Sequence, residues 1–184
     1  MGLCDTVTFK YYLRYGSDKT YPLSLYMPVK KVDTWKFTNG ASGSWTEVDF
    51  SDSSWSNYAS SGSASTTGTQ YYRKAFTGLS TGAAAYEIGV NYRYGVVVYV
   101  NAVEKFRDNM PTGTPSSSTV ANGSYTESAF RKVIRNAYGI TTSAVLAIEL
   151  HFLQLTHNTA DFDAYIAFYA STTPSADSGS ELFG

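Results

Sequence analysis

The segment from Ala84 to Asn109 constrains the fold more strongly than any other part of the sequence. Between Tyr86 and Tyr94 every second residue is apolar, which is the period of a β-strand with one buried face. The residues from Val96 to Val100 then form a continuous β-branched and aromatic run, typical of a strand that is covered on both faces. A third strand is predicted from Val103 to Arg107. Segments this apolar require a larger β structure around them.

A two-residue turn at positions 101–102 is predicted to join the last two of these strands. Such a turn sets Val100 opposite Val103 and Val97 opposite Phe106. The usual Asn-Gly pair is replaced here by Asn-Ala. If the alanine takes a positive φ, that conformation costs about 1 kcal/mol relative to glycine. A different turn type is therefore the alternative.

The rest of the chain predicts further strands, so that about ten are expected in all. They are expected at residues 6–15, 21–29, 32–38, 70–76, 145–154 and 162–170. Residues 125–136 leave the choice between a strand and a short helix open. Two segments rich in Ser, Gly, Thr or Pro predict long surface loops, at residues 51–69 and 109–122. Without a long helix or alternating βαβ units, this pattern indicates an all-β antiparallel sandwich.

Composition and charge set limits on the class of protein. With 184 residues the chain fits one domain, predicted over residues 1–170, followed by a polar flexible tail or linker at 171–184. The 14 basic and 15 acidic residues form no basic cluster, which argues against a nucleic acid partner. No apolar run approaches the roughly 20 residues of a membrane span. The N-terminus shows no secretion signal, so an extracellular or cell-surface location is expected only if a native signal is missing.

Four segments occur in an order and spacing that resemble a known domain family. They are Asp52-Ser53-Ser54-Trp55, Tyr72-Arg73-Lys74-Ala75-Phe76, Val98-Tyr99-Val100-Asn101 and Val145-Leu146-Ala147-Ile148-Glu149-Leu150. The region from Trp45 to Ala170 resembles the galactose-binding-like jelly-roll domain, in particular the non-catalytic sugar-binding domain of family 2 glycoside hydrolases. The resemblance implies a jelly-roll β-sandwich attached to other domains, and a structural role for the tryptophan of the first segment.

The residues that we predict to bind a sugar lie on or beside the long loops. An aromatic ring can stack on the apolar face of a pyranose. A guanidinium with a neighbouring amide can hydrogen-bond to vicinal hydroxyls in a fixed fork. The predicted ligand-binding residues are Trp45, Tyr58, Arg107, Asn109, Tyr125 and His157. For Asn109 the alternative is that its side chain only holds its own loop.

Several other residues have a functional and a structural interpretation. Trp55 is either a sugar platform or, as the resemblance implies, a plug at the end of the sandwich, and Trp35 is expected in the core. Trp45, beside a glycine-rich turn, is expected to be the most open of the three tryptophans. Arg73 and Glu149 form either a ligand-orienting pair or an ion pair between neighbouring strands.

The metal and catalytic signals in the sequence are weak. His151 and His157 are six residues apart and lack the further ligands of a zinc site. Asp161 and Asp163 could donate oxygens to a structural calcium, as in related jelly rolls, but no dedicated calcium loop accompanies them. No Gly-x-Ser-x-Gly elbow is present. We therefore expect no catalytic residues and no required cofactor or metal.

The sequence thus predicts a non-catalytic carbohydrate-binding module of a larger multidomain protein. Its partners would be a glycan and a neighbouring domain or protein. The alternative is a structural or protein-interaction β-sandwich without a sugar ligand, because a Tyr-rich surface also suits protein contacts. A hydrolase is a more distant third hypothesis, which an acid and a base converging in a cleft would support.

Overall fold

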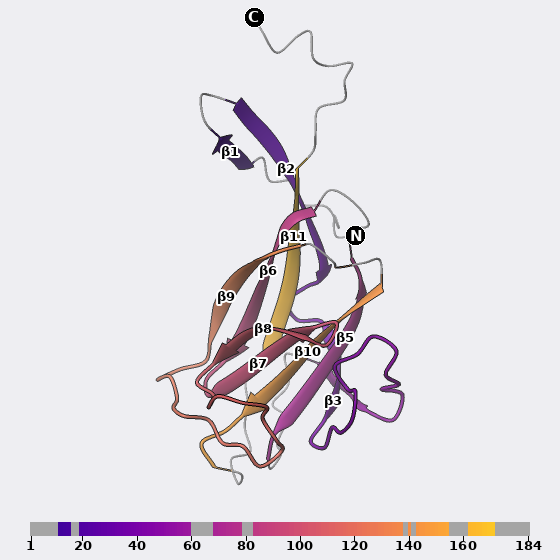
Figure 1. Ribbon diagram of the computed structural model, residues 1–184, viewed down its shortest axis with the longest axis vertical. Helices are drawn as coiled ribbons and strands as arrows, with labels where there is room; N and C mark the ends of the chain where they lie inside the picture. The colour runs from indigo at the N-terminus through magenta and orange to yellow at the C-terminus, as the bar shows by residue number, and fades with distance from the viewer. Residues whose placement is uncertain are drawn as a thin grey trace, which may run out of the picture.

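The computed structural model describes residues 11–15, 19–59, 68–78, 83–137, 140, 143–154 and 162–171. These residues contain eleven β-strands and no helix. The strands form two antiparallel sheets that pack face to face as a sandwich (Figure 1). The all-β antiparallel sandwich predicted from the sequence is therefore confirmed, in a form consistent with a jelly roll. Cys4, His157, Asp161 and the segment 172–184 lie outside the described residues.

The two sheets draw their strands from distant parts of the chain. In spatial order, the five-stranded sheet contains β1 (Tyr11–Tyr15), β2 (Lys19–Val29), β11 (Asp163–Ser171), β6 (Ala83–Tyr92) and β9 (Ala129–Asn136). The six-stranded sheet contains β4 (Ser56–Ala59), β3 (Thr34–Thr38), β5 (Gln70–Thr77), β10 (Ser143–His151), β7 (Gly95–Val100) and β8 (Val103–Asp108). The hairpin of β1 with the start of β2 extends beyond the sandwich (Figure 1). Among the described residues no helix has the length and apolarity that crossing a membrane requires.

The core lies between the sheets and consists mainly of alternate residues from the central strands. The rings of Tyr72 and Phe162 stack with their centroids 3.7 Å apart, and Trp35 meets the same phenylalanine edge-on. β7 is almost wholly buried on both faces, as the apolar run from Val96 to Val100 predicted. β10 is almost wholly buried as well, including the polar side chains of Glu149 and His151. Trp35 is in the core, as expected.

The predicted turn at residues 101–102 is confirmed, but the predicted register of its hairpin is only partly right. Both turn residues have positive φ, and Val100 pairs with Val103. Phe106 pairs with Val98 rather than with Val97, because a β-bulge leaves Lys105 without an opposite residue. The bulge turns Phe106 into the core, where an aromatic side chain gains most from burial.

Three local predictions are settled by the structure. The expected loop at 51–69 is wrong at residues 56–59, which form the edge strand β4 against β3. The ambiguous segment 125–136 contains a strand, β9, and no helix. β3 begins two residues later than predicted, because Val32 has a positive φ that a continuous strand does not accommodate.

The buried tyrosines predict a loss of stability at alkaline pH. Burial raises the pKa of Tyr71, Tyr86 and Tyr165 to about 12. In the unfolded chain tyrosine ionises near pH 10, so the folded state holds these protons more tightly. The stabilisation is complete below about pH 10 and is lost as the pH rises toward 12. Parallel titrations of tyrosinate absorbance and circular dichroism should show late ionisation coupled to unfolding. Ionisation of all tyrosines near pH 10 with the fold retained would contradict this prediction.

Candidate functional site

The outer face of the six-stranded sheet is covered by two long loops, which together form the surroundings of the candidate site. The first covering loop, residues 39–55, joins β3 to β4. The second covering loop, residues 109–122, follows β8. Because both loops bury polar strand residues as well as apolar ones, this face carries most of the interior charge of the described part of the protein.

Arg73 on β5 fixes the first covering loop. Its guanidinium donates to the carboxylate of Asp52, with Nε 3.0 Å from Oδ2, and to the backbone carbonyls of Trp45, Glu47 and Phe50. The side chain is 2% exposed. The predicted pairing of Arg73 with Glu149 is wrong, because the strand register places Ala147 rather than Glu149 opposite the arginine.

Two of the three aromatic residues predicted to bind the sugar, Trp45 and Tyr58, are buried. Trp45 is 9% exposed and meets the rings of Tyr71 and Tyr99 edge-on. Tyr58 is 6% exposed in the main core, where its hydroxyl donates to the carbonyl of Phe162. Neither ring presents a free face for a pyranose. Trp55 is more exposed than Trp45, so the expected order of these two tryptophans is reversed.

The second covering loop is seated directly on Gly95, the first residue of β7. A Cβ atom added to Gly95 would lie 2.4 Å from Met110 Sδ and 2.9 Å from Ala121 Cβ. Asn109 has a positive φ, and its side-chain amide donates to the carbonyl of Tyr94. Its own carbonyl accepts from the backbone amide of Asn122, which closes the base of the loop. Asn109 therefore holds its own loop, the alternative that the sequence left open.

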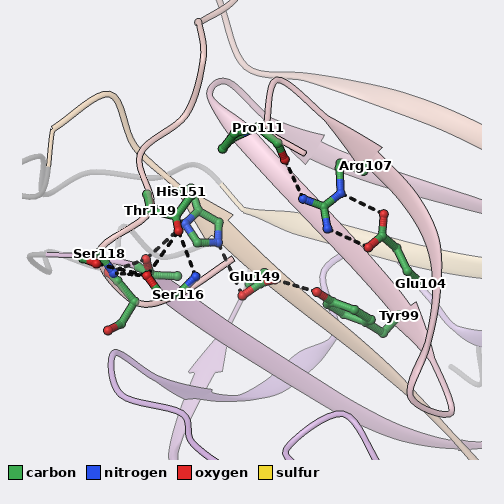
Figure 2. A network of polar contacts seen from close by, with 11 residues as sticks. Tyr99, Glu104, Arg107, Pro111, Ser116, Ser118, Thr119, Glu149 and His151 are labelled. Atoms are coloured by element: carbon green, nitrogen blue, oxygen red, sulfur yellow. Dashed lines mark hydrogen bonds and ion pairs between the residues drawn. The ribbon is translucent and has the colours of Figure 1, made fainter. Parts of the chain in front are cut away.

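Beneath the second covering loop lies a buried polar network (Figure 2). His151 is 0% exposed, and its Nδ1 lies 2.8 Å from the carbonyl oxygen of Thr119. Its Nε2 lies 3.4 Å from Oε2 of Glu149, and the other carboxylate oxygen accepts a hydrogen bond from the Tyr99 hydroxyl. Burial raises the pKa of Tyr99 well above its usual range, and the neighbouring Glu149 adds to this effect. The phenol therefore stays neutral and connects the buried network to the surface.

At the outer end of this network is a cavity of about 460 Å³. It is lined by Tyr99, Glu104, Arg107, Thr112, Gly113, Thr114 and Pro115. Arg107 Nε and Nη2 donate to the two carboxylate oxygens of Glu104 at 2.8 and 2.7 Å, and Nη1 donates to the Pro111 carbonyl (Figure 2). The guanidinium is therefore held in one orientation at the wall of the cavity.

The β-bulge explains why Glu104 and Arg107 meet. Two strand residues three positions apart normally point to opposite faces of a sheet. Because Lys105 is the extra residue, Glu104 pairs with Tyr99 and Arg107 pairs with Val97, so all of them share the outer face. Sequence periodicity alone could not reveal this pair, since it assumes strict alternation along the strand.

Tyr125 and Asp163, which the sequence also singled out, do not line this cavity. Tyr125 donates its hydroxyl to Asp108 and lies under the guanidinium of Arg131, whose Cζ is 3.2 Å from the ring centroid. One of its faces is thus already covered. The carboxylate of Asp163 accepts hydrogen bonds from the backbone amides of Val32 and Ala164. Among the described residues, no group of three or more His, Cys, Asp or Glu side chains is placed to hold a metal ion.

A second cavity of about 270 Å³ lies at the end of β10. Arg93 borders it, and this arginine donates from Nε to the carbonyl of Tyr125. The other residues that line it are Tyr92, Tyr94, Gly95, Thr126, Glu127, Ser128, Leu150, His151 and Phe152. The cavities beside Arg107 and Arg93 therefore compete as binding sites, one at the Tyr99 end and the other at the His151 end of the buried network.

Comparisons with known proteins connect this chain to others by structure alone. No family model matches the sequence, and no curated protein matches it. A calcium-binding mutant of β-glucuronidase 2 from Bacteroides uniformis matches with a TM-score of 0.51 and 15% identity, over 79% of this chain and 18% of that one. A β-glucuronidase from an uncultured Clostridium species matches with a TM-score of 0.51 and 8% identity, over 89% of this chain and 31% of that one.

This chain thus spans less than a third of the length of either β-glucuronidase. At these identities the likeness concerns the fold and not the activity. The chain has the β-sandwich fold of a part of these glycoside hydrolases, which confirms the resemblance predicted from the four sequence segments.

Proposed function

We propose that this protein is a non-catalytic carbohydrate-binding module of a larger protein, and that the cavity beside Arg107 is its sugar site. The observation that carries the proposal is the oriented guanidinium at the wall of a surface cavity, held by Glu104 and by the Pro111 carbonyl. The cavity volume of about 460 Å³ falls within the range of roughly 300 to 1,000 Å³ typical of small-molecule sites.

The groups around the cavity suit the hydroxyls of a sugar. An arginine carries five N–H donors, and three of those of Arg107 are engaged by Glu104 and Pro111. The remaining two, one on each Nη, have no partner among the described residues and can donate to hydroxyl oxygens. The Glu104 carboxylate can accept from hydroxyls in turn. The half-buried ring of Tyr99 adds an apolar surface for the ring carbons of the sugar.

The fold supports a module rather than an enzyme. The described chain matches only a fraction of each β-glucuronidase, as one domain of a longer protein would. The charged side chains of the cavity are tied to each other by two hydrogen bonds, an arrangement that suits recognition better than proton transfer. We therefore assign no catalytic residue to the chain.

Replacing Arg107 by alanine tests the proposal. A glycan array with the wild-type protein, with calcium and with a chelator, should identify the class of sugar bound. Arg107→Ala should weaken that binding by about tenfold or more, because a charged donor in the site is worth about 1.5 to 3 kcal/mol. The stability should change little, since the ion pair with Glu104 is partly exposed. Titration calorimetry and thermal unfolding would measure both effects.

Arg93→Ala is the matched control, because it removes a guanidinium beside the second cavity and leaves the first intact. Loss of binding in Arg93→Ala alone would move the site to the second cavity. Retained binding in both variants would contradict the assignment to either cavity. Absence of binding to any glycan by folded wild-type protein would overturn the carbohydrate function in favour of a structural or protein-interaction module.

A further inference from the structure

We infer that the cavity beside Arg107 selects neutral sugars over uronic acids, and that Glu104 is the residue that determines this preference. The inference rests on the proposed carbohydrate function and concerns the same cavity. Its physical basis is the net charge that a ligand meets in the cavity. That charge follows from the contacts of the few ionisable side chains in and behind the cavity wall.

Arg107 is the one cationic side chain among the described residues that line the cavity. Its charge is compensated by Glu104, which binds it through both carboxylate oxygens at 2.7 and 2.8 Å. Hydrogen bonding to Arg107 lowers the pKa of Glu104, and the same bond raises the pKa of the arginine. The two side chains therefore remain a charge-neutral pair throughout the neutral pH range.

The groups behind the wall add no positive charge. Tyr99 is neutral and donates to Glu149, which lies behind it. Glu149 in turn faces His151, with Oε2 3.4 Å from Nε2, and the Glu149 carboxylate adds to the rise in the pKa of Arg107. Thr112, Gly113, Thr114 and Pro115 complete the lining and carry no ionisable side chain. The site as a whole is neutral or acidic.

A carboxylate ligand that approaches Arg107 would also approach Glu104. The attraction and the repulsion would cancel, while the carboxylate would still lose its hydration on entry. A neutral hydroxymethyl group loses far less solvation and can use the remaining donors of Arg107. The geometry therefore disfavours the oxidised form of a sugar relative to its neutral parent.

The test compares neutral and acidic forms of the same sugars. The probes are the methyl glycosides of glucose, galactose and mannose, each paired with the corresponding uronate. They are titrated into the whole chain, and binding is followed by NMR with the Arg107 Nε–H resonance as the local reporter. We expect each uronate to bind about tenfold more weakly than its neutral partner, or not at all. In Glu104→Gln the guanidinium keeps its place but loses its counter-charge. The affinity for the uronates should then rise about tenfold relative to that for the neutral sugars, and added salt should reduce this effect.

Glu47→Gln is the matched control, because it makes the same charge change at an exposed position that lines neither of the two cavities. It should leave the ratio of neutral to acidic binding unchanged. Wild-type protein that binds uronates as well as or better than neutral sugars would overturn the inference and leave the carbohydrate function standing. An unchanged ratio in Glu104→Gln would also overturn it. If none of the glycosides binds and the glycan array is blank as well, the proposed function falls and the inference falls with it.

Discussion

Replacing Arg73 by alanine is expected to lower the free energy of unfolding by about 3 to 5 kcal/mol. The guanidinium is 2% exposed and donates hydrogen bonds to Asp52 and to three backbone carbonyls of the first covering loop. Without it those acceptors stay buried and lose their donor, at a cost of about 1 to 3 kcal/mol each if the loop does not move. We therefore expect the loop to detach in part, which would uncover Trp45. Urea unfolding followed by circular dichroism and tryptophan fluorescence measures both consequences.

Lys74→Ala is the control for this prediction. Lys74 is the next residue along β5, and its ammonium pairs with Asp33 near the surface. Its removal should cost about 1 kcal/mol or less. The loss of stability in Arg73→Lys should lie between those of the two alanine variants, because an ammonium is a compact point charge and cannot reach acceptors on different sides. Equal losses for Arg73→Ala and Lys74→Ala would show that the contacts of Arg73 do not hold the loop.

Replacing Gly95 by alanine is expected to cost about 2 to 3 kcal/mol through overpacking. The added methyl group would overlap Met110 Sδ and Ala121 Cβ and would lie 3.1 Å from the carbonyl oxygen of Asn109. The sulfur can move, but the backbone of the second covering loop must shift as well. Since Thr112 to Pro115 of that loop line the cavity, glycan binding should fall together with stability. Chemical unfolding and glycan titration of the same variant test the link.

Two comparisons separate this effect from a general penalty on replacing glycine. A methyl group added to Gly40 would meet no atom within 4 Å, and this glycine has no positive φ, so Gly40→Ala should be nearly neutral. Met110→Ala removes the atom nearest to the new methyl group at position 95. The double variant Gly95→Ala, Met110→Ala should therefore lose less stability than the sum of the two single changes, by at least about 0.5 kcal/mol. Strict additivity would contradict the proposed contact.

The candidate site was only partly accessible from the sequence. Arg107 was predicted because it lies beside a long loop, and it does line the cavity. The same argument predicts Trp45 and Tyr58, but both are buried. Trp45 is buried because its loop folds back on the sheet, and Tyr58 because it belongs to the edge strand β4 and packs in the main core. Glu104 and Tyr99 were missed as site residues. Their place in the site depends on which strands are neighbours and on the β-bulge in β8, and neither can be read from local periodicity.

The sequence by itself determined most of the strands, the buried character of β7 and the sandwich, because alternation and β-branched runs are local properties of the chain. Only the tertiary structure decided the partners of the interior charges. Asp52 is 21 residues from Arg73, and Tyr99 is 50 residues from Glu149. Such pairs form where strand register and loop closure bring them together, and the free energy that selects the register belongs to the whole core. The fold therefore follows from local patterns, whereas the site depends on long-range packing.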